Sequence, residues 1–398
     1  MVSVKALDEL TPADLWQMVP HDEDFWQDTG ERMRGVLKHL MQGALEEEQV
    51  QLLAASRYRR TEVRRGYRNG YYERDLVTQL GVVQGIRVPR ARGLPGEHAV
   101  FAHYERRQPE VNRLIRDVFL RGVSTREVGR VLETMLGERV SAATVSRIAR
   151  SLDAEVQRFH AEPLDDAWRY LLLDGVYLRV KGAAGVKRRL VLCAYGIGID
   201  GRRRLLDFRL AESESATCWE AFLTQLQTRG LLGHHLRLVS TDGCQGLHAA
   251  LQVVYPYVPR QHCWAHKLRN VSNLLKRSQR EEALRGARAI YLAETRRQAV
   301  ATYWTWARRW RTEAPKAVAC LERDLDELLA HFACPLADRI KVRTTNAIER
   351  CFREVRRSTR PMSCFTNDAS CQRIIFAVFS HLNAHWEETA PCQFTHKA

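Results

Sequence analysis

The pattern of apolar and polar positions changes several times along the chain, and each change predicts a different element. Residues 1–56 carry apolar side chains at intervals of three and four, which is typical of an amphipathic helix whose apolar face packs on another helix. These positions are Met33, Val36, Leu37, Leu40, Met41, Ala44 and Leu45. Between 57 and 107, β-like runs at 75–80 and 85–88 are interrupted by Gly and Pro. Two short strands are expected there.

Residues 109–153 predict three short helices. Ser124 is expected to cap the second helix in a capping box with Glu127, and Gly137 to end it. Ser141 would begin the third. A capped helix, a glycine turn and a short polar helix are typical of a helix-turn-helix DNA-binding domain. Other small helical domains share this arrangement of caps and turns. The residues expected to face DNA are Ser141, Thr144 and Arg147.

From 168 to 262 the pattern becomes α/β. Three strand-like runs follow one another, and then a helix at 215–228, a further strand and a helix at 245–253. This order predicts a mixed sheet with helices on its faces. Residues 267–335 are helical in pattern, and two apolar-faced helices follow, the first ending before Pro361 and the second at 369–382. Trp304, Trp306 and Trp310 lie in the helical stretch 267–335 and are expected to pack in its core. The alternative is that they stack on unpaired DNA bases.

Composition narrows the class of protein. The 398 residues suffice for two or three domains, and 45% hydrophobic with 27% charged residues exclude a mainly disordered, collagen-like or membrane-dominated chain. The net charge of +15 points to a polyanion, and residues 57–107 hold 12 Arg and no Lys against 5 acidic residues. Tyrosines are interleaved with these arginines, which favours contact with DNA. The alternative is a solvated basic surface with the tyrosines half-buried beneath it. The arginines assigned to DNA are Arg59, Arg60, Arg64, Arg65 and Arg68.

The ten cysteines form no CxxC pair and no compact framework, and the N-terminal residues resemble no signal peptide. The apolar runs are shorter than the roughly 20 residues that a spanning helix needs. We therefore expect a cytoplasmic protein without disulfides or membrane contact.

Two aspartates stand out in the apolar strands. Asp174 lies inside LLLDGVYLRV, and Asp242 ends RLVSTDG, where Gly243 allows the chain to turn. Acids at strand ends are good ligands for a hard cation such as Mg²⁺. The alternative for Asp242 is that it caps the following helix.

Several segments together resemble the mutator-type transposases of the bacterial IS256 family. They are TTNAIERCFREVRRSTRPM, RLVSTDGCQGL, QHCWAHKLRN and LLLDGVYLRV, with YRNGYYERDLVT, VPRARG and GVSTREVGRVLETMLGERVSAATVSRI upstream. The resemblance covers about residues 55–385. Its most specific parts are NAIERCFREVRR and the CxxH that follows the second aspartate.

The resemblance implies an α/β, RNase H-like catalytic core interrupted by an all-α insertion and preceded by a mainly helical DNA-binding region. It implies a DDE triad of Asp174, Asp242 and Glu349, the last of which would otherwise be interpreted as part of a surface salt bridge. Three such carboxylates could hold two Mg²⁺ or Mn²⁺ ions for phosphoryl transfer. The resemblance also assigns a supporting role in the core to Cys263 and His266, whose spacing alone is insufficient for a zinc site. Arg353 and Arg356 share a helix face with Glu349 and are expected to reach phosphate.

The expected organisation is a helical region at 1–56, a basic segment at 57–107, a helix-turn-helix domain at 108–160, the catalytic core at 165–266 and 336–385, the insertion at 267–335 and a tail at 386–398. The expected function is DNA transposition: binding of terminal inverted repeats, strand cleavage and strand transfer to target DNA. The resemblance implies a bacterial, nucleoid-associated protein that acts as a homo-oligomer on paired ends. The alternatives are an RNase H-like nuclease or recombinase that does not join strands, and a domesticated, non-catalytic DNA-binding protein.

Overall fold

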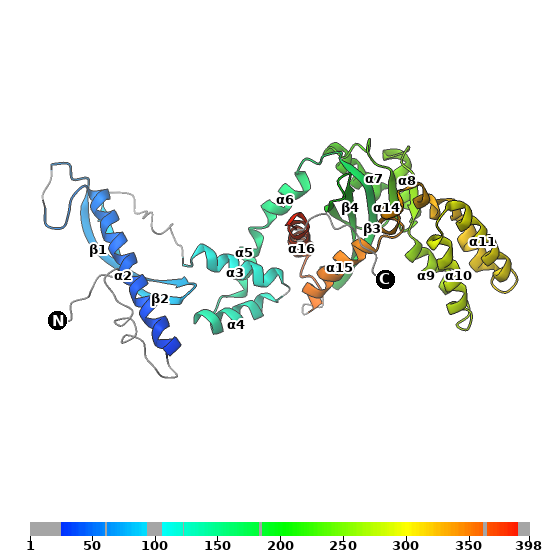
Figure 1. Cartoon of the computed structure of the whole chain (residues 1–398). Coiled ribbons are helices and arrows are strands. Elements are labelled where there is room, and N and C mark those ends of the chain that lie inside the picture. The colour runs from blue at the N-terminus through cyan, green and yellow to red at the C-terminus, as the bar shows by residue number, and fades with distance from the viewer. Residues whose placement is uncertain are drawn as a thin grey trace, which may run out of the picture. The chain divides into compact units, whose positions relative to one another are not determined.

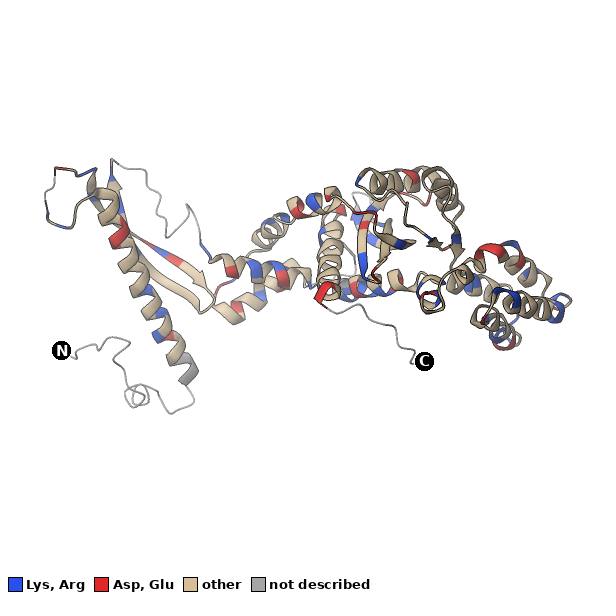
Figure 2. Ribbon diagram, turned by 45° about the horizontal axis from the view of Figure 1, so that its top comes forward, with Lys and Arg blue, Asp and Glu red and all other residues tan. Residues whose placement is uncertain are grey.

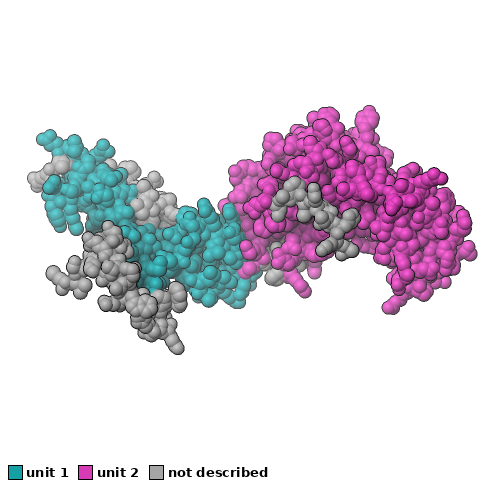
Figure 3. Space-filling model, viewed as in Figure 1, with its two compact units in different colours: residues 1–119, 124–149 teal, residues 120–123, 150–398 magenta. Residues whose placement is uncertain are grey.

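The computed structural model describes residues 25–59, 62–93, 106–121, 123–182, 185–360 and 364–388. The chain divides into two compact units, residues 1–119 with 124–149 and residues 120–123 with 150–398 (Figure 3). Each unit is described by itself. None of the helices in these ranges is long and apolar enough to cross a membrane. The nine cysteines within them are free thiols.

The first unit contains a long helix and a β-hairpin. Helix α2 (Phe25–Leu53) lies against β1 (Tyr67–Thr78) and β2 (Gly81–Arg92), which pair antiparallel (Figure 1). Both strands are longer than the runs that the sequence predicts. The apolar core between helix and hairpin consists of Leu45, Leu76, Val83, Ile86 and Val88, with Leu37, Met41 and Tyr72 beside it.

The helix predicted within residues 1–56 is confirmed as α2, and residues 1–24 lie outside the described residues. The predicted partner of this helix is wrong. The apolar face of α2 packs on the hairpin and not on another helix, because a two-stranded sheet needs a cover on one face to be stable. Only part of the predicted apolar face is used. Met33, Val36 and Leu40 remain exposed on the far side of the helix.

Three short helices follow as predicted, α3 (Pro109–Leu120), α4 (Thr125–Leu136) and α5 (Ala142–Arg150). Ser124 caps α4 by accepting from the Glu127 N–H, and the Glu127 carboxylate accepts from Arg130. Gly137 ends α4 with φ of 71° in the left-handed region, where glycine carries no steric penalty. Gly129 allows close packing, since a Cβ there would lie 2.4 Å from the Val140 carbonyl oxygen.

The second unit is built on a five-stranded sheet in the order β5-β4-β3-β6-β7. The strands are β3 (Trp168–Gly182), β4 (Gly185–Gly198), β5 (Arg203–Ala211), β6 (Leu238–Thr241) and β7 (Arg260–His262). β3, β4 and β5 form an antiparallel meander, and β6 and β7 extend the other side of β3 in parallel. The predicted mixed sheet is confirmed.

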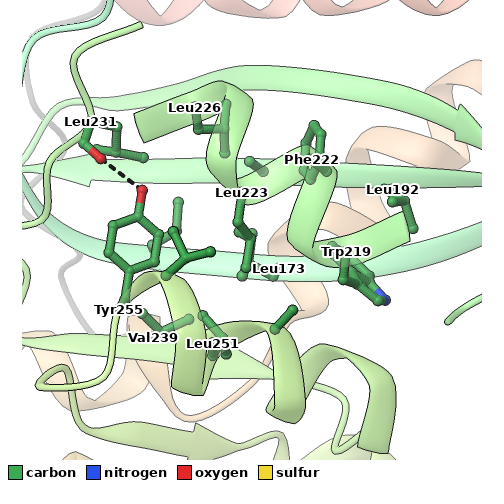
Figure 4. Packing of buried hydrophobic residues seen from close by; sticks show 14 of the residues in the cluster. Leu173, Leu192, Trp219, Phe222, Leu223, Leu226, Leu231, Val239, Leu251 and Tyr255 are labelled. Atoms are coloured by element: carbon green, nitrogen blue, oxygen red, sulfur yellow. Dashed lines mark hydrogen bonds between the residues drawn. The ribbon is translucent and has the colours of Figure 1, made fainter. Parts of the chain in front are cut away.

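Helices cover both faces of this sheet. On one face, α7 (Ala216–Thr228) and α8 (Gln245–Val254) pack with the strands around Trp219, Phe222 and Leu173, and the Tyr255 hydroxyl closes the end of this core by donating to the Leu231 carbonyl at 2.7 Å (Figure 4). On the other face lie α15 (Asn346–Thr359) and α16 (Asp368–Glu388), which contact β3 and β5. Helix α6 (Asp153–Ala161) is tied to α16 by the Asp153–Arg373 ion pair.

The segment between β7 and α15 is helical, as predicted, and has an apolar core of its own. Trp306 and Trp310 are buried in that core, which confirms the packing interpretation for both, whereas Trp304 is 49% exposed. The elements are α9 (Trp264–Asn273), α10 (Arg280–Leu292), α11 (Arg296–Trp310), α12 (Pro315–Arg323), α13 (Leu325–Leu328), η2 (Ala330–Ala333) and α14 (Leu336–Val342).

Candidate active site

The register of two parallel strands brings Asp174 and Asp242 to the same level of the sheet. The last pair of the β3–β6 ladder is Leu172 with Ser240, and each aspartate lies two residues further along its strand. Asp174 continues within β3, while Asp242 is the first residue after β6. Ligand and catalytic groups of open sheets gather at such carboxyl ends of strands.

Asp174 is a buried carboxylate with an unsatisfied oxygen. Its side chain lies in β3 among fully buried leucines, the residue is 4% exposed, and its Oδ2 has no hydrogen-bond partner. The pKa of Asp174 is raised to about 7, first by burial and then by repulsion from Asp242 and Glu349. His266 and the Thr345 hydroxyl act in the opposite direction. Asp242 and Glu349 are therefore close enough to Asp174 to raise its pKa.

Asp242 lies in a tight turn between β6 and α8. Its Oδ1 accepts from the Cys244 N–H at 3.0 Å within this turn. The N-cap residue of α8 is Cys244 and has no side-chain cap bond, so Asp242 does not cap the helix. Gly243 has φ of 87°, and a Cβ at this position would lie 2.1 Å from the His262 ring. Only glycine satisfies both the conformation and the close approach.

Glu349 lies in the first turn of α15, which packs on the sheet face to which Asp174 points. Buried Ile348 and Phe352 anchor this helix, and the Phe352 ring packs edge-on against Phe379 of α16. The Oε1 of Glu349 lies 3.5 Å from His266 Nε2 and 3.7 Å from an Arg269 guanidinium nitrogen. Two cationic side chains of α9 thus face the third acid.

Cys263 and His266 connect α9 to the start of α15. The Cys263 sulfur accepts from the Thr345 N–H at 3.3 Å, and the Thr345 hydroxyl lies 3.5 Å from both the sulfur and His266 Nδ1. The hydrogen bond and charge of Cys263 raise the pKa of His266 to about 9, and Asp174 and Asp242 add to this effect. Burial alone would raise the pKa of the Cys263 thiol, but His266 and Thr345 outweigh burial and lower it. His266 is therefore cationic at neutral pH.

A fourth carboxylate, Glu214, lies beside this cluster and was not predicted from the sequence. A Cβ on Gly175 would lie 2.8 Å from Glu214 Oε1, and burial and Asp242 raise the pKa of Glu214. A signal was available, because Glu214 follows β5 at the same edge of the sheet as Asp174. The strand-end rule that selected Asp242 also applies to this position.

Carboxylate oxygens are suitable ligands for Mg²⁺ or Mn²⁺. Within the described part of the chain, no group of three or more His, Cys, Asp or Glu side chains lies close enough together to hold a metal ion. The observation that favours a cation is the unsatisfied Oδ2 of Asp174, because a buried charged oxygen without a partner is costly.

The arginines of the basic segment 57–107 that are assigned to DNA have different surroundings. Arg59 and Arg65 are exposed, and Arg60 lies outside the described residues. The Arg64 guanidinium lies 4.7 Å from the centre of the Tyr67 ring, which is 66% exposed. Arg68 instead binds Glu46 and Gln49 of α2. Arginine–tyrosine stacking continues across the strands with the pairs Arg87–Tyr71 and Arg90–Tyr72.

The helical residues assigned to DNA are largely at the surface. Ser141 is exposed and caps α5 by accepting from the Thr144 N–H, and Arg147 is exposed one turn further on. Arg353 and Arg356 are exposed on α15, four and seven residues after Glu349. Lys and Arg residues are distributed along the helices and strands of both units (Figure 2).

The fold and the site define an α/β protein with carboxylates gathered at the strand ends of a mixed sheet. The family model of the transposases of the Mutator family matches residues 14–389. The transposase of insertion sequence element ISRM5 from Rhizobium meliloti is 33% identical over 356 residues, 89% of each chain. The transposase of IS406 from Burkholderia multivorans is 35% identical over 353 residues, 88% of this chain and 90% of its own.

A further relative is the transposase of IS256 in transposon Tn4001 from Staphylococcus aureus, 28% identical over 361 residues, 89% of this chain and 90% of its own. The chain therefore belongs to the Mutator family of transposases. The resemblance to this family inferred from the sequence motifs is confirmed. Transposases act on DNA.

Proposed function

We propose that the protein is a DDE transposase in which Asp174, Asp242 and Glu349 act together in strand cleavage and strand transfer. The observation that supports the proposal is the geometry: the β3–β6 register sets Asp174 and Asp242 at the same level of the sheet, and Glu349 lies in the first turn of α15, which packs against β3. Asp242 and Glu349 also raise the pKa of the buried Asp174. The strand order β5-β4-β3-β6-β7, with three antiparallel and two parallel strands, supports an RNase H-like core. The helices between β7 and α15 are the insertion of this core.

We propose that Asp174, Asp242 and Glu349 supply oxygen ligands to Mg²⁺ or Mn²⁺, two ions being expected, which requires the three carboxylates to come closer together than they lie in this structure. When bound, these cations would activate the attacking oxygen and stabilise the leaving 3′ oxygen of the phosphodiester. Asp174 fits this role because its Oδ2 is buried without a partner. Asp242 keeps its carboxylate oriented through the bond from the Cys244 N–H.

The side chains around the acids orient them and balance their charge. His266 is cationic and lies beside Glu349, so it offsets part of the repulsion among the three carboxylates. Cys263 fixes the beginning of α15 through Thr345, four residues before Glu349. Arg269 adds a second cation near Glu349, in reach of the phosphate on which charge develops.

The first unit would bind the terminal inverted repeats. Helices α3, α4 and α5 have the order and caps of a helix-turn-helix, with Ser141, Thr144 and Arg147 on the reading helix. Arg64, just before the hairpin, and the exposed Tyr67 at its start add to this surface, since arginine binds phosphate and tyrosine can stack on sugars and bases. Arg68 has a structural role in this account because it is held by Glu46.

A reaction on a duplex that carries the terminal repeat and its flank tests the proposal. The wild-type protein with Mg²⁺ should release a 3′-OH at the end of the repeat and join it to target DNA. Glu349→Gln should lose both products and still bind the repeat. Glu354→Gln, a matched change on the same helix at a residue that pairs with Arg357, should retain them. Cleavage without joining by the wild type, or near-normal products from Glu349→Gln, would contradict the proposal.

A further inference from the structure

Beyond the catalytic aspartate, β3 and β4 continue as a two-stranded ribbon. The β3–β6 ladder ends at Leu172, and the β4–β5 ladder begins at Leu190. Residues 178–181 and 186–189 pair with each other past the body of the sheet. We propose that one face of this ribbon is a DNA phosphate-binding surface that holds the strand flanking the cleaved bond. The proposal rests on the proposed function, in which Asp174 marks the place of cleavage.

The register of the ribbon defines this face. In the antiparallel ladder Tyr177 is opposite Leu190, Arg179 is opposite Arg188, and Lys181 is opposite Val186. Directly opposed residues point to the same side of a sheet, and alternate residues of a strand do so too. Tyr177, Arg179, Lys181 and Arg188 therefore share one face, and all four are exposed. We call these four residues the basic ribbon face.

The basic ribbon face begins next to the acids. Asp174 itself points to the side of α15, while its neighbour Gly175 lies on the same side as Tyr177. Glu214 lies over Gly175, and its charge raises the pKa of Tyr177 together with burial, the larger cause. The surface thus changes from acidic beside the site to basic along the ribbon.

The positive charge on this face is uncompensated. Arg179 and Arg188 stand directly opposite each other, an arrangement that destabilises a ladder. Neither they nor Lys181 form an ion pair with any residue that the structure describes; the Arg188 guanidinium instead lies 4.7 Å from the centre of the Tyr177 ring. On the opposite face, by contrast, Arg189 binds Asp368 and lies 3.7 Å from Glu212. Unpaired like charges at this spacing are complementary to a polyanion.

The backbone of the ribbon is braced from the side. Phe365 donates its N–H to the Arg179 carbonyl at 2.9 Å and accepts from the Lys181 N–H at 2.8 Å. These two bonds fix the strand segment that carries the charges. A rigid platform loses less conformational entropy when it binds a ligand than a mobile loop does.

The position of the charges identifies the occupant as the DNA strand next to the cut. Arg179 is five residues beyond Asp174, about 17 Å along an extended strand. At about 3.4 Å per nucleotide, this is the length of about five nucleotides. Arginine forks bind phosphate oxygens, and an exposed tyrosine beside them can contact a sugar or base. The basic ribbon face should therefore contact phosphates about three to five nucleotides from the cleaved bond.

Phosphate ethylation interference with the full-length protein and uncut terminal-repeat duplex tests this proposal. For the wild type, ethylation of the phosphates about three to five nucleotides from the cleavage position should impair binding. Arg179→Gln/Arg188→Gln should lose this interference and keep that within the repeat. Its apparent Kd should rise about tenfold, and the slope of log K against log salt should fall by about 2 because two phosphate contacts are lost.

Two further variants serve as controls. Lys187→Gln removes a positive charge from the same ribbon, but Lys187 is opposite Val180 and points to the other face, so the footprint should not change. Arg179→Lys/Arg188→Lys keeps the charge and should restore most of the salt slope.

A double Gln variant with the wild-type footprint and affinity would overturn the proposal. A change in oligomeric state with unchanged DNA contacts would also overturn it, since the face would then bind a second copy of the chain. The experiment measures binding to uncut DNA and does not depend on cleavage. A wild-type protein that neither cleaves nor joins DNA would contradict the proposed function, whereas the interference pattern would still test the basic ribbon face.

Discussion

The backbone N–H of Thr345 donates to the sulfur of Cys263 across 3.3 Å. This bond joins the residue at the beginning of α9 to the residue immediately before the helix that carries Glu349. The position of the third acid therefore depends on a cysteine more than eighty residues away in the sequence.

Replacing Cys263 should impair catalysis without impairing DNA binding. Cys263→Ala removes the acceptor for Thr345 and the partner of His266, and loss of such supporting contacts typically costs 10- to about 100-fold in activity. Cys263→Ser should recover part of the loss because its hydroxyl can still accept. Cleavage rates and terminal-repeat affinity of both variants measure the effect. Equal impairment by Ala and Ser, with weakened DNA binding, would show that the cysteine only supports folding.

Gly129 should be intolerant of any side chain. Gly129→Ala places a Cβ 2.4 Å from the Val140 carbonyl oxygen, and a backbone shift of this kind costs about 1–3 kcal/mol in unfolding free energy. Affinity for the terminal repeat should fall with it. Gly35→Ala in α2 is the control, since no atom lies within 4 Å of its Cβ position, and it should stabilise the helix by up to about 1 kcal/mol. Thermal unfolding that is the same in both variants would refute the close packing.

Arg147 should contribute to the salt dependence of terminal-repeat binding. It is exposed on α5, and the loss of one phosphate contact reduces the slope of log K against log salt by about 1. Arg147→Gln should show this reduction in fluorescence anisotropy titrations. Arg130→Gln, whose guanidinium is paired with Glu127, should show little change. A wild-type slope for Arg147→Gln would remove this residue from the DNA contact.

The helical insertion should lose stability in acid because of His331. Burial, aided by the charges of Arg343 and Arg339, lowers the pKa of His331 to about 4, below its value of about 6.5 in an unfolded chain. The unfolded state therefore binds the proton more readily, so stability is full above pH 6.5 and declines towards pH 4. The expected loss is about 1.4 kcal/mol per pH unit. Urea unfolding followed by tryptophan fluorescence at pH 7 and 5.5 should show this loss. His331→Phe should remove the part that His331 contributes, while His262, whose pKa burial also lowers to about 4, retains its own.

The sequence predicts the second unit better than the first, for physical reasons. Apolar runs such as LLLDGVYLRV identify buried strands directly, and β3 to β6 follow in the predicted order. The three-residue strand β7 is too short to give a pattern of its own and is not predicted. In β1 the outer half is polar, and its order depends on arginine–tyrosine stacking with β2. Such contacts between strands leave no apolar alternation in the sequence. Because the sequence pattern does not reveal the hairpin as a packing surface, it predicts a helix as the partner of the apolar face of α2.

The three acids also differ in how far the sequence alone identifies them. Asp174 and Asp242 are visible from the sequence because a charge inside or at the end of an apolar strand is costly without a role. Glu349 lies in a helix rich in charged residues, where nothing local distinguishes it from a surface glutamate. Only the resemblance of NAIERCFREVRR to the family selects it. The contacts of Thr345 with Cys263 and His266 depend on tertiary packing and have no local signal in the sequence.

The central claim is that three carboxylates act as one catalytic unit, and the rates of DNA strand cleavage in single and combined variants test it most directly. With saturating Mg²⁺, Asp174→Asn and Asp242→Asn should each reduce cleavage by about 10⁴-fold, and the double variant should be no slower than either, because residues that act as a unit are not additive. Asp200→Asn, in the exposed turn between β4 and β5, should cleave at the wild-type rate. Cleavage by either single variant within tenfold of the wild type would contradict the account.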